Sequence, residues 1–232
     1  MMYKSIYKPN VPRDASSIII LKKKNNRYYV LMGRRPKHSR FMPGIYVFPG
    51  GAVEKEDYKI NKIFNLSATI NEGLIKSRSK KQTMAILYAA IRETAEECGL
   101  FIAEKKQISE PKKAFSGTIW EKFIRKSLVP SIKNLNYFGR AITPTFLKVR
   151  FHARFFITRF ENCIGKIKGN GELENLGWVE INEAKLLPIA DVTEFLINRV
   201  IASNVDKSKF KQLYPMFSRR NNKKWVKWDK KI

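Results

Sequence analysis

The sequence predicts an α/β protein of the α+β sandwich class, with a mixed sheet held between helices. Short runs of β-branched and aromatic residues, separated by turn residues, recur along the chain, and two longer stretches have the composition or spacing of helices. Of the 232 residues, 44% are hydrophobic and 12% are aromatic, so the chain can bury a core and is not broadly disordered. We expect a single domain over residues 1–232.

The N-terminal part predicts a hairpin followed by a short strand. Residues 1 to about 15 form a loose lead-in. The apolar run at 17–21 and the segment 28–32 are separated by a polar turn with Asn25-Asn26, which is typical of a hairpin. A short strand at 45–48 runs directly into Pro49-Gly50-Gly51.

The middle of the chain predicts one long helix. Residues 58–82 are irregular and largely polar, which indicates an insertion. The stretch 83–98 contains several Ala and Leu and is followed by Gly99, a helix terminator. A short strand is expected at 100–103.

The second half alternates between the two kinds of element. Residues 151–160 alternate in hydrophobicity, which predicts a half-buried strand. The remaining expected elements are helices at 120–128 and 192–202, a strand at 176–179, and a late hairpin formed by 214–217 and 225–228.

The chain is strongly basic, with 46 Lys+Arg against 20 Asp+Glu and a net charge of +26. Residues 206–232 form a basic C-terminal segment with ten Lys/Arg and two Asp/Glu, and the rest of the charge is spread along the chain. Such a surface suits phosphate-bearing partners, but a general Lys-rich composition produces it too, so charge alone does not choose a function.

The apolar runs, the N-terminal residues and the cysteines indicate where in the cell the protein is located. No apolar run approaches the ~18 residues that a membrane span needs, and the N-terminus lacks the apolar stretch of a secretory signal. The two cysteines, Cys98 and Cys163, do not form a disulfide framework. We therefore expect a cytoplasmic protein with no membrane partner.

Three glutamates near the end of the long helix predict a metal site. Glu93, Glu96 and Glu97 share one helix face, where like charges at i and i+4 cost about 0.2–0.5 kcal/mol. They also lie at the negative end of the helix dipole. A hard divalent cation such as Mg²⁺ or Mn²⁺ removes both penalties. The alternative is a solvated acidic face.

Two neighbouring features fit the same site. Arg92 is either a surface residue or orients one carboxylate through a bidentate pair. The turn at Pro49-Gly50-Gly51 permits close backbone approach, so a carbonyl there can reach a metal, although a Gly-Gly pair is often only a turn.

Together these residues resemble the Nudix hydrolase signature, G-x5-E-x7-R-E-U-x-E-E-x-G-U, where U is aliphatic. Gly51 matches the opening glycine, and residues 92–100 match the second half except that Thr94 replaces an aliphatic residue. Asp57 stands at the position of the first glutamate, and 34 residues rather than seven separate it from Arg92. The resemblance implies a Nudix fold with an insertion at 58–82 inside the Nudix box.

Further segments are similar to one Nudix branch, which contains the peroxisomal coenzyme A diphosphatases and their bacterial relatives. That branch has an interrupted box preceded by a segment like RRPKHSRFMPGIYVFPGG at 34–51. The other matching segments are 12–15, 140–144, 154–156 and 171–176.

The resemblance implies a metal-dependent pyrophosphohydrolase that cleaves a nucleoside diphosphate linked to another group, here coenzyme A or acyl-coenzyme A. It implies a small-molecule nucleotide partner and leaves a homodimer open. The implied site consists of catalytic Arg92, Glu93 and Glu97; metal ligands Glu93, Glu96, Glu97, Gly50 and Glu172, with Glu174 as the alternative to Glu172; and phosphate-binding Arg34 or Arg35.

Two other hypotheses stay open. The same chemistry can act on NADH, ADP-ribose or RNA 5′ ends, although nucleic acid is the less favoured partner. A non-catalytic basic scaffold that binds RNA or protein is the third. The intact Glu93, Glu96 and Glu97 argue against the scaffold, whereas Asp57 and the insertion argue for it.

Overall fold

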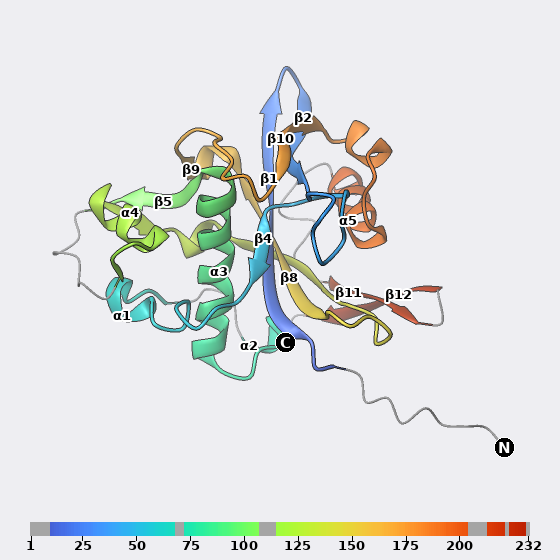
Figure 1. The fold of residues 1–232 in the computed structure, drawn as a ribbon, viewed down its shortest axis with the longest axis horizontal. Helices are drawn as coiled ribbons and strands as arrows, with labels where there is room; N and C mark the ends of the chain where they lie inside the picture. The colour runs from blue at the N-terminus through green and yellow to red at the C-terminus, as the bar shows by residue number, and fades with distance from the viewer. Residues whose placement is uncertain (1–9, 68–71, 107–114, 204–212, 221–222, 231–232) are drawn as a thin grey trace.

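A mixed sheet runs through the centre of the molecule, and helices cover both of its faces (Figure 1). The computed structural model describes residues 10–67, 72–106, 115–203, 213–220 and 223–230. In these residues the sheet has nine strands and seven of them follow one another in space. Their order is β10 (Glu174–Glu180), β2 (Arg27–Arg34), β1 (Arg13–Lys24), β8 (Phe151–Arg159), β7 (Asn136–Ile142), β11 (Leu213–Arg220) and β12 (Lys223–Lys230).

Two short strands and a small second sheet complete the β structure. Strand β3 (Tyr46–Val47) pairs with β2, and β4 (Gly50–Ala52) pairs with β1. The second sheet has the order β6 (Leu128–Pro130), β5 (Phe101–Lys105), β9 (Cys163–Ile164). Strand β1 runs parallel to β8, and β7 runs parallel to β11, so the main sheet is mixed as expected.

The helices form two layers. Helices α3 (Lys80–Cys98) and α4 (Ile119–Arg125), with the short α1 (Asn61–Phe64) and α2 (Glu72–Ile75), lie on one side of the sheet, and α5 (Asp191–Ala202) lies on the other (Figure 1). Three 3₁₀ helices lie wholly within the described residues, η2 (Ile132–Asn134), η3 (Phe160–Asn162) and η4 (Glu183–Leu186). No helix in the described part of the chain is long and apolar enough to cross a membrane.

Strand β1 shows why two helical layers are needed. Ile18 and Ile20 pack into the core under α3, whereas Ile19 and Leu21 pack into the core under α5. Successive side chains of a strand point to opposite faces, so a continuous apolar run is buried only when both faces are covered.

Helix α3 begins and ends where local chemistry dictates. The Ser79 hydroxyl accepts a hydrogen bond from the Gln82 backbone N–H at 3.2 Å, which caps the N-terminus. Gly99 adopts a left-handed conformation with φ of 66°, and its N–H donates to the Ala95 carbonyl. The predicted helix is confirmed, and it starts three residues earlier than expected.

The predicted hairpins are also confirmed. Asn25 and Asn26 both have positive φ, 48° and 58°, which is typical of the two-residue turn that joins twisted strands. At the other end, β11 pairs with β12 along its full length. In the described part of the basic segment, β11 joins the main sheet beside β7.

Three expectations need correction. Strand β1 already begins at Arg13, inside the expected lead-in. Residues 58–82 contain α1, α2 and the first turn of α3 rather than irregular chain. Strand β8 is not half-buried at its centre, because Phe155 packs into one core and Phe156 into the other.

Strand β7 was not predicted, because its sequence does not look like a central strand. Gly139 has φ of 151° at a break in the β7–β8 register, and Pro215 of β11 approaches so closely that a Cβ at Gly139 would lie 2.9 Å from the ring. Arg140 is buried in this strand and donates to Asp229 of β12 at 2.8 Å. Both residues are explained by contacts with distant parts of the chain.

Candidate active site

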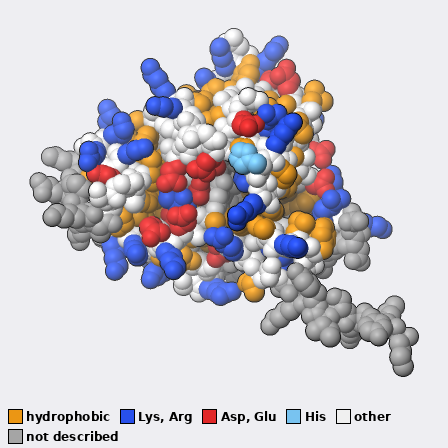
Figure 2. All heavy atoms as spheres, in the orientation of Figure 1, with side chains coloured by type: hydrophobic (Ala, Val, Ile, Leu, Met, Phe, Trp, Pro, Cys, Tyr) orange, Lys and Arg blue, Asp and Glu red, His pale blue; other side chains and the backbone are white. Residues whose placement is uncertain are grey.

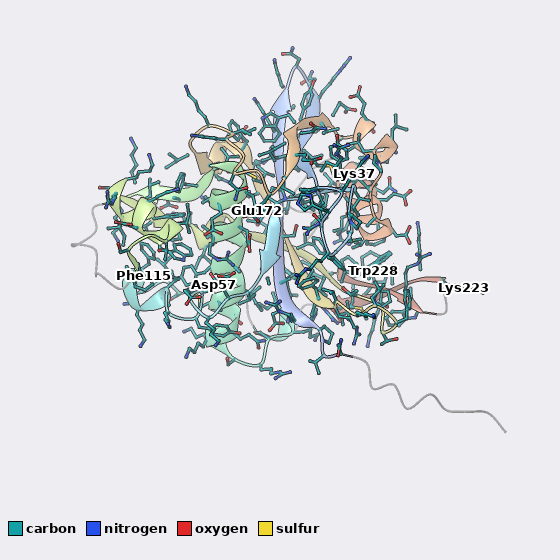
Figure 3. The ribbon with its side chains drawn as sticks, viewed as in Figure 1. Lys37, Asp57, Phe115, Glu172, Lys223 and Trp228 are labelled. Carbon is teal, nitrogen blue, oxygen red and sulfur yellow. The ribbon has the colours of Figure 1, made fainter. Side chains whose placement is uncertain are left out.

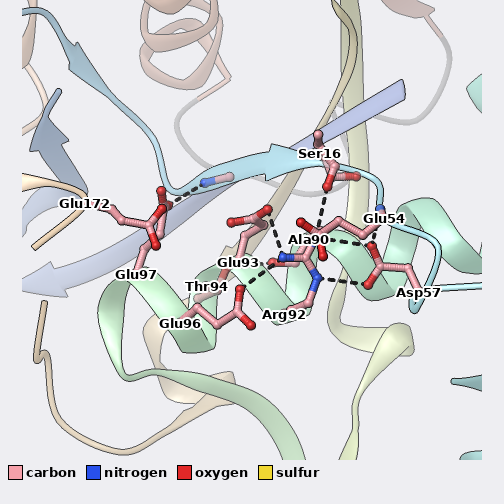
Figure 4. Close-up of polar contacts among 12 residues, drawn as sticks. Ser16, Glu54, Asp57, Ala90, Arg92, Glu93, Thr94, Glu96, Glu97 and Glu172 are labelled. Carbon is pink, nitrogen blue, oxygen red and sulfur yellow. Dashed lines mark hydrogen bonds and ion pairs between the residues drawn. The ribbon is translucent and has the colours of Figure 1, made fainter. Parts of the chain in front are cut away.

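The carboxylates of the C-terminal half of α3 face β4 and the turn before it (Figure 4). Glu93 and Glu97 are 8% and 4% exposed, and the Glu96 side chain is 34% exposed. Burial of two carboxylates one helical turn apart is costly without compensation. Hydrogen bonds and ion pairs from the surrounding groups provide this compensation.

Arg92 is the centre of the ion-pair network. Its Nη1 donates to Glu93 Oε1 and to Glu96 Oε2, both at 3.0 Å. Its Nε and Nη2 donate to the two oxygens of Asp57 at 3.0 and 3.2 Å, and Nη2 also donates to the Ala52 carbonyl at 2.9 Å. One guanidinium therefore fixes two α3 carboxylates relative to β4.

Asp57, the shorter carboxylate at the position of the signature glutamate, serves this arginine. It is 1% exposed and also accepts a hydrogen bond from the Glu54 backbone N–H at 2.8 Å. Asp57 does not line the cavity described below. Asp57 thus joins α3, through Arg92, to the loop that follows β4.

The two glycines of β4 are needed for close packing. A Cβ on Gly51 would lie 2.5 Å from the carboxyl carbon of Glu93, and a Cβ on Gly50 would overlap the backbone of Ser16 and Ser17. The Gly50 N–H donates to Glu97 Oε2 at 2.9 Å. Backbone and carboxylates are therefore in direct contact at this point.

Thr94, the departure from the aliphatic position of the signature, is fully buried on α3. Its hydroxyl donates to the Ala90 carbonyl one turn back at 2.9 Å, so its polar group is satisfied within the helix. The departure does not disturb the carboxylates.

The surroundings raise the pKa of all three α3 glutamates. Removal from water is the largest cause that raises the pKa of Glu93 to about 7 and of Glu97 to about 8, and the negative charge of Glu172 contributes to both. Burial also raises the pKa of Glu96. For Arg92 burial acts to lower the pKa, but Asp57, Glu93 and Glu96 outweigh it, so the pKa is raised and the guanidinium stays charged.

A cavity of about 760 Å³ opens beside these carboxylates. Glu93, Glu97 and Glu172 line one part of it together with Gly50 and Arg35. The acidic side chains form one group on this face, at the side of a hollow (Figure 2). The remaining walls come from β7, β8, β11, the start of α5 and two loops, and their side chains are mostly apolar, among them Phe41, Met42, Ile142, Phe151, Phe155 and Phe217.

The predicted site residues outside α3 divide into two groups. Glu172 lies near the C-terminal half of α3 (Figure 3) and lines the cavity, whereas Glu174 forms an ion pair with Arg34 at 2.7 Å. Arg35 lines the cavity and donates through Nε to the Phe41 carbonyl at 2.8 Å. Arg34 is outside the cavity lining.

Carboxylate oxygens are the donors that a hard divalent cation prefers. Among the described residues, however, no three His, Cys, Asp or Glu side chains enclose an ion position as they stand. Glu93 and Glu96 turn toward Arg92, and Glu97 turns toward the Gly50 N–H. The donor set fits such an ion chemically, and its binding requires these side chains to rotate.

Other residues that the sequence brought forward lie away from this chemistry. Cys98 is fully buried, and burial raises its pKa. Trp228 of the late hairpin packs against Phe195, with ring centroids 6.4 Å apart, and under Arg199 (Figure 3).

Comparison with known proteins identifies the architecture. A Nudix hydrolase structure from Alicyclobacillus acidocaldarius superposes with a TM-score of 0.65 at 24% identity, covering 83% of this chain and 92% of that chain. The chain has the Nudix hydrolase fold. A MutT protein structure from Bacillus halodurans has a TM-score of 0.52 at 15% identity, covering 94% of this chain and 97% of that chain.

The sequence comparison is narrower. Acyl-coenzyme A diphosphatase NUDT19 of Xenopus laevis is 30% identical over 96 residues. The match spans 32% of this chain and only 25% of that relative. No protein-family model matches the chain. The structural neighbours include Nudix hydrolases and the curated relative is a diphosphatase.

Sequence reasoning missed the walls of the cavity. Phe217 and Arg219 come from β11 and Asp191 from the start of α5, far along the chain from α3. No signal in the sequence could have placed Phe217 and Arg219, because they reach the site only through the pairing of β11 with β7. Asp191 likewise reaches it through the tertiary fold, at the start of α5.

Proposed function

We propose that this chain is a metal-dependent pyrophosphohydrolase that cleaves a nucleoside diphosphate linked to another group, with coenzyme A or an acyl-coenzyme A as substrate. The observation that carries the proposal is the placement of Glu93, Glu97 and Glu172 on the wall of one large cavity, next to Arg35. Concentrated negative charge at a cavity wall suits cation-assisted chemistry on a phosphate.

The α3 carboxylates and Glu172 would hold Mg²⁺ or Mn²⁺, with the Gly50 carbonyl as a further ligand. A bound divalent ion neutralises the pyrophosphate and lowers the pKa of an attacking water. Arg92 positions Glu93 and Glu96 through Nη1. Glu93 or Glu97, whose pKa is raised by burial, would accept the proton of that water.

Arg35 is the better placed of the two arginines for binding substrate phosphate. It lines the cavity, whereas Arg34 is paired with Glu174. A guanidinium matches phosphate geometry bidentately. The apolar walls at Phe41, Phe151 and Phe155 leave room for the part of the substrate beyond the diphosphate.

The named activity of the Xenopus relative supports coenzyme A or acyl-coenzyme A as the substrate class, together with the segments that resemble the coenzyme A branch. Two free cysteines agree with a reducing compartment such as the cytoplasm.

Product analysis by phosphorus NMR or chromatography, with Mg²⁺ or Mn²⁺, tests the proposal. The panel contains coenzyme A, dephospho-coenzyme A, an acyl-coenzyme A, NADH, ADP-ribose and a 5′-triphosphate RNA. Release of adenosine 3′,5′-bisphosphate from coenzyme A or its acyl form, absent in the Glu96→Gln/Glu97→Gln variant and retained in the exposed-site control Glu183→Gln, is the expected result.

Two outcomes would redirect the proposal. Hydrolysis of NADH, ADP-ribose or RNA alone keeps the chemistry and changes the substrate. A chain that hydrolyses no compound with either metal, yet binds RNA equally well with and without Glu96→Gln/Glu97→Gln, is the scaffold of the third hypothesis.

A further inference from the structure

Four exposed hydrophobic side chains gather at one end of the sheet, and we name them the rim patch: Val11, Phe146, Leu147 and Val149. Their exposed fractions are 78%, 65%, 40% and 40%. In the described part of the chain the other large exposed hydrophobics, Leu186, Leu213 and Trp228, belong to other elements. Single exposed hydrophobics are ordinary, whereas a cluster marks an interaction surface.

Hydrogen bonds hold the segments of the rim patch together. Asn10 donates through Nδ2 to the Lys148 carbonyl at 2.8 Å, and Arg150 donates through Nη1 to the Asn10 carbonyl. The Arg13 N–H donates to the Arg150 carbonyl at 2.9 Å. Residue 11 is thereby tied to the loop between β7 and β8.

The loop itself is closed at its base. Arg150 donates through Nε to the Thr143 carbonyl at 3.1 Å, and the Phe151 N–H donates to the Thr143 hydroxyl at 3.0 Å. These bonds fix both ends of the loop, so Phe146 and Leu147 at its tip stay exposed instead of folding back into the core. The exposure of Phe146 and Leu147 is therefore a consequence of the loop conformation that these hydrogen bonds fix.

The segments that carry these apolar side chains are also basic. Arg13, Lys148 and Arg150 lie in the same two segments, and none of them forms an ion pair with a carboxylate that the structure describes. The neighbouring carboxylate, Asp14, is engaged by Arg154. The rim patch thus combines apolar tips with unneutralised positive charge, in a chain whose net charge is +26.

We propose that the rim patch docks the protein onto the surface of an anionic phospholipid bilayer. Apolar side chains with flanking Lys and Arg are the combination that binds at a lipid interface, where acyl chains accept the former and headgroups the latter. The expectation of no membrane partner rested on the missing span, and surface docking needs no span. This proposal does not rest on the proposed function.

Other occupants fit the surface less well. A nucleic acid would pair with the three cations but offers little to four exposed aliphatic and aromatic side chains. A second copy would bring its own positive charge to an already positive patch. An anionic bilayer satisfies both the charge and the apolar surface.

Docking would also orient the cavity. Phe146 and Leu147 belong both to the rim patch and to the cavity lining. Pro144 of the same loop lines the cavity as well. The cavity mouth would then face the bilayer, so an amphiphilic ligand could pass between the two without crossing water.

Co-sedimentation of the full chain with phospholipid vesicles tests the proposal. Vesicles of phosphatidylcholine containing phosphatidylglycerol should retain the protein, and pure phosphatidylcholine vesicles should retain much less. Phe146→Ser/Leu147→Ser should lower the partition coefficient about tenfold or more. Leu186→Ser, which removes an 85% exposed leucine elsewhere, is the matched control and should bind as the unmodified chain does.

The salt dependence separates docking from charge attraction alone. Raised salt should weaken the binding of both proteins, and the difference between Phe146→Ser/Leu147→Ser and the unmodified chain should persist. Equal binding of the two proteins at every salt concentration would overturn the proposal, because diffuse charge would then explain all of it.

Two companion measurements address the other occupants. The thermal midpoint of each variant confirms folding, since only exposed side chains are changed. RNA binding and dimer formation are measured as well, the latter by sedimentation velocity. The proposal would be overturned if the unmodified chain does not bind anionic vesicles but binds RNA or dimerises, and if Phe146→Ser/Leu147→Ser abolishes that RNA binding or dimer. None of these measurements uses hydrolysis, so they are independent of the activity panel.

Discussion

Gly51 offers a test of the contact between β4 and α3. Alanine at this position would place a Cβ 2.5 Å from the Glu93 carboxyl carbon and 2.9 Å from Oε2. Ordinary contact begins at about 3.4 Å, so the carboxyl carbon must move by about 0.9 Å. Gly51 does not have a positive φ, so the effect is steric and does not arise from backbone strain.

The displacement can be converted to an expected rate. A misplacement of about 1 Å in a catalytic group costs about 100-fold, which corresponds to about 2.7 kcal/mol in the activation free energy. Overpacking of this kind also lowers stability by about 1–3 kcal/mol. For a chain of this size that is a thermal midpoint lower by about 2–12 °C.

The assay compares Gly51→Ala with Gly177→Ala. Gly177 lies in β10, where an added Cβ meets nothing within 4 Å, so this control should retain both rate and thermal midpoint. The rate is measured on the substrate that the product panel identifies, and the midpoint by circular dichroism. A Gly51→Ala protein whose kcat is within about twofold of the unmodified enzyme would refute the steric argument.

Three further predictions follow from buried charges. Asp57→Asn removes the bidentate partner of buried Arg92 and should lower the unfolding free energy by about 3 kcal/mol, measured with urea. His152→Gln should flatten the loss of stability on acidification. Burial, with the charges of neighbouring arginines, lowers the folded-state pKa of His152 to about 3, so the unfolded chain binds the extra proton as the pH falls from about 6.5. Asp229→Asn breaks the buried pair with Arg140 and should speed amide exchange in β11 and β12 but not in α3.

Two of these have a control at a less buried side chain, and the third is compared with the unmodified chain. Glu121→Gln removes an exposed ion pair and should cost less than about 1 kcal/mol, so an equal loss in Asp57→Asn would mean that its burial is irrelevant. A pH profile of stability in His152→Gln identical to that of the unmodified chain would contradict the assignment. Lys227→Gln on β12 should not alter exchange, and unchanged exchange in Asp229→Asn would show that the hairpin is held by other contacts.

The sequence predicted those elements whose cause is local. The run at 17–21 is apolar after Ser17, and the stretch 83–98 combines helix formers with Gly99, so both β1 and α3 followed from neighbouring residues. Strand β7 could not be predicted in this way. Its Gly139 and Arg140 oppose a central strand locally, and they are accommodated only by Pro215 and Asp229.

In the candidate site, too, the features with a local cause were predicted and those that depend on tertiary contacts were not. The three α3 glutamates were found because helical spacing brings them together without any tertiary information. The choice between Glu172 and Glu174 depended on the partner that each residue finds, and Arg34 takes Glu174. Asp57 was placed at the signature position, but its pairing with Arg92 is a tertiary contact across 35 residues that spacing does not reveal.

The late position of β11 in the chain has a consequence for biosynthesis. On the ribosome, α3 and its glutamates emerge long before residue 213, and until β11 arrives the outer side of β7 is an unpaired sheet edge. Phe217 and Arg219, which wall the cavity, arrive with the same strand. A polypeptide released before this strand would carry Glu93, Glu97 and Glu172, yet it would lack a wall for a ligand and would expose an edge open to aggregation.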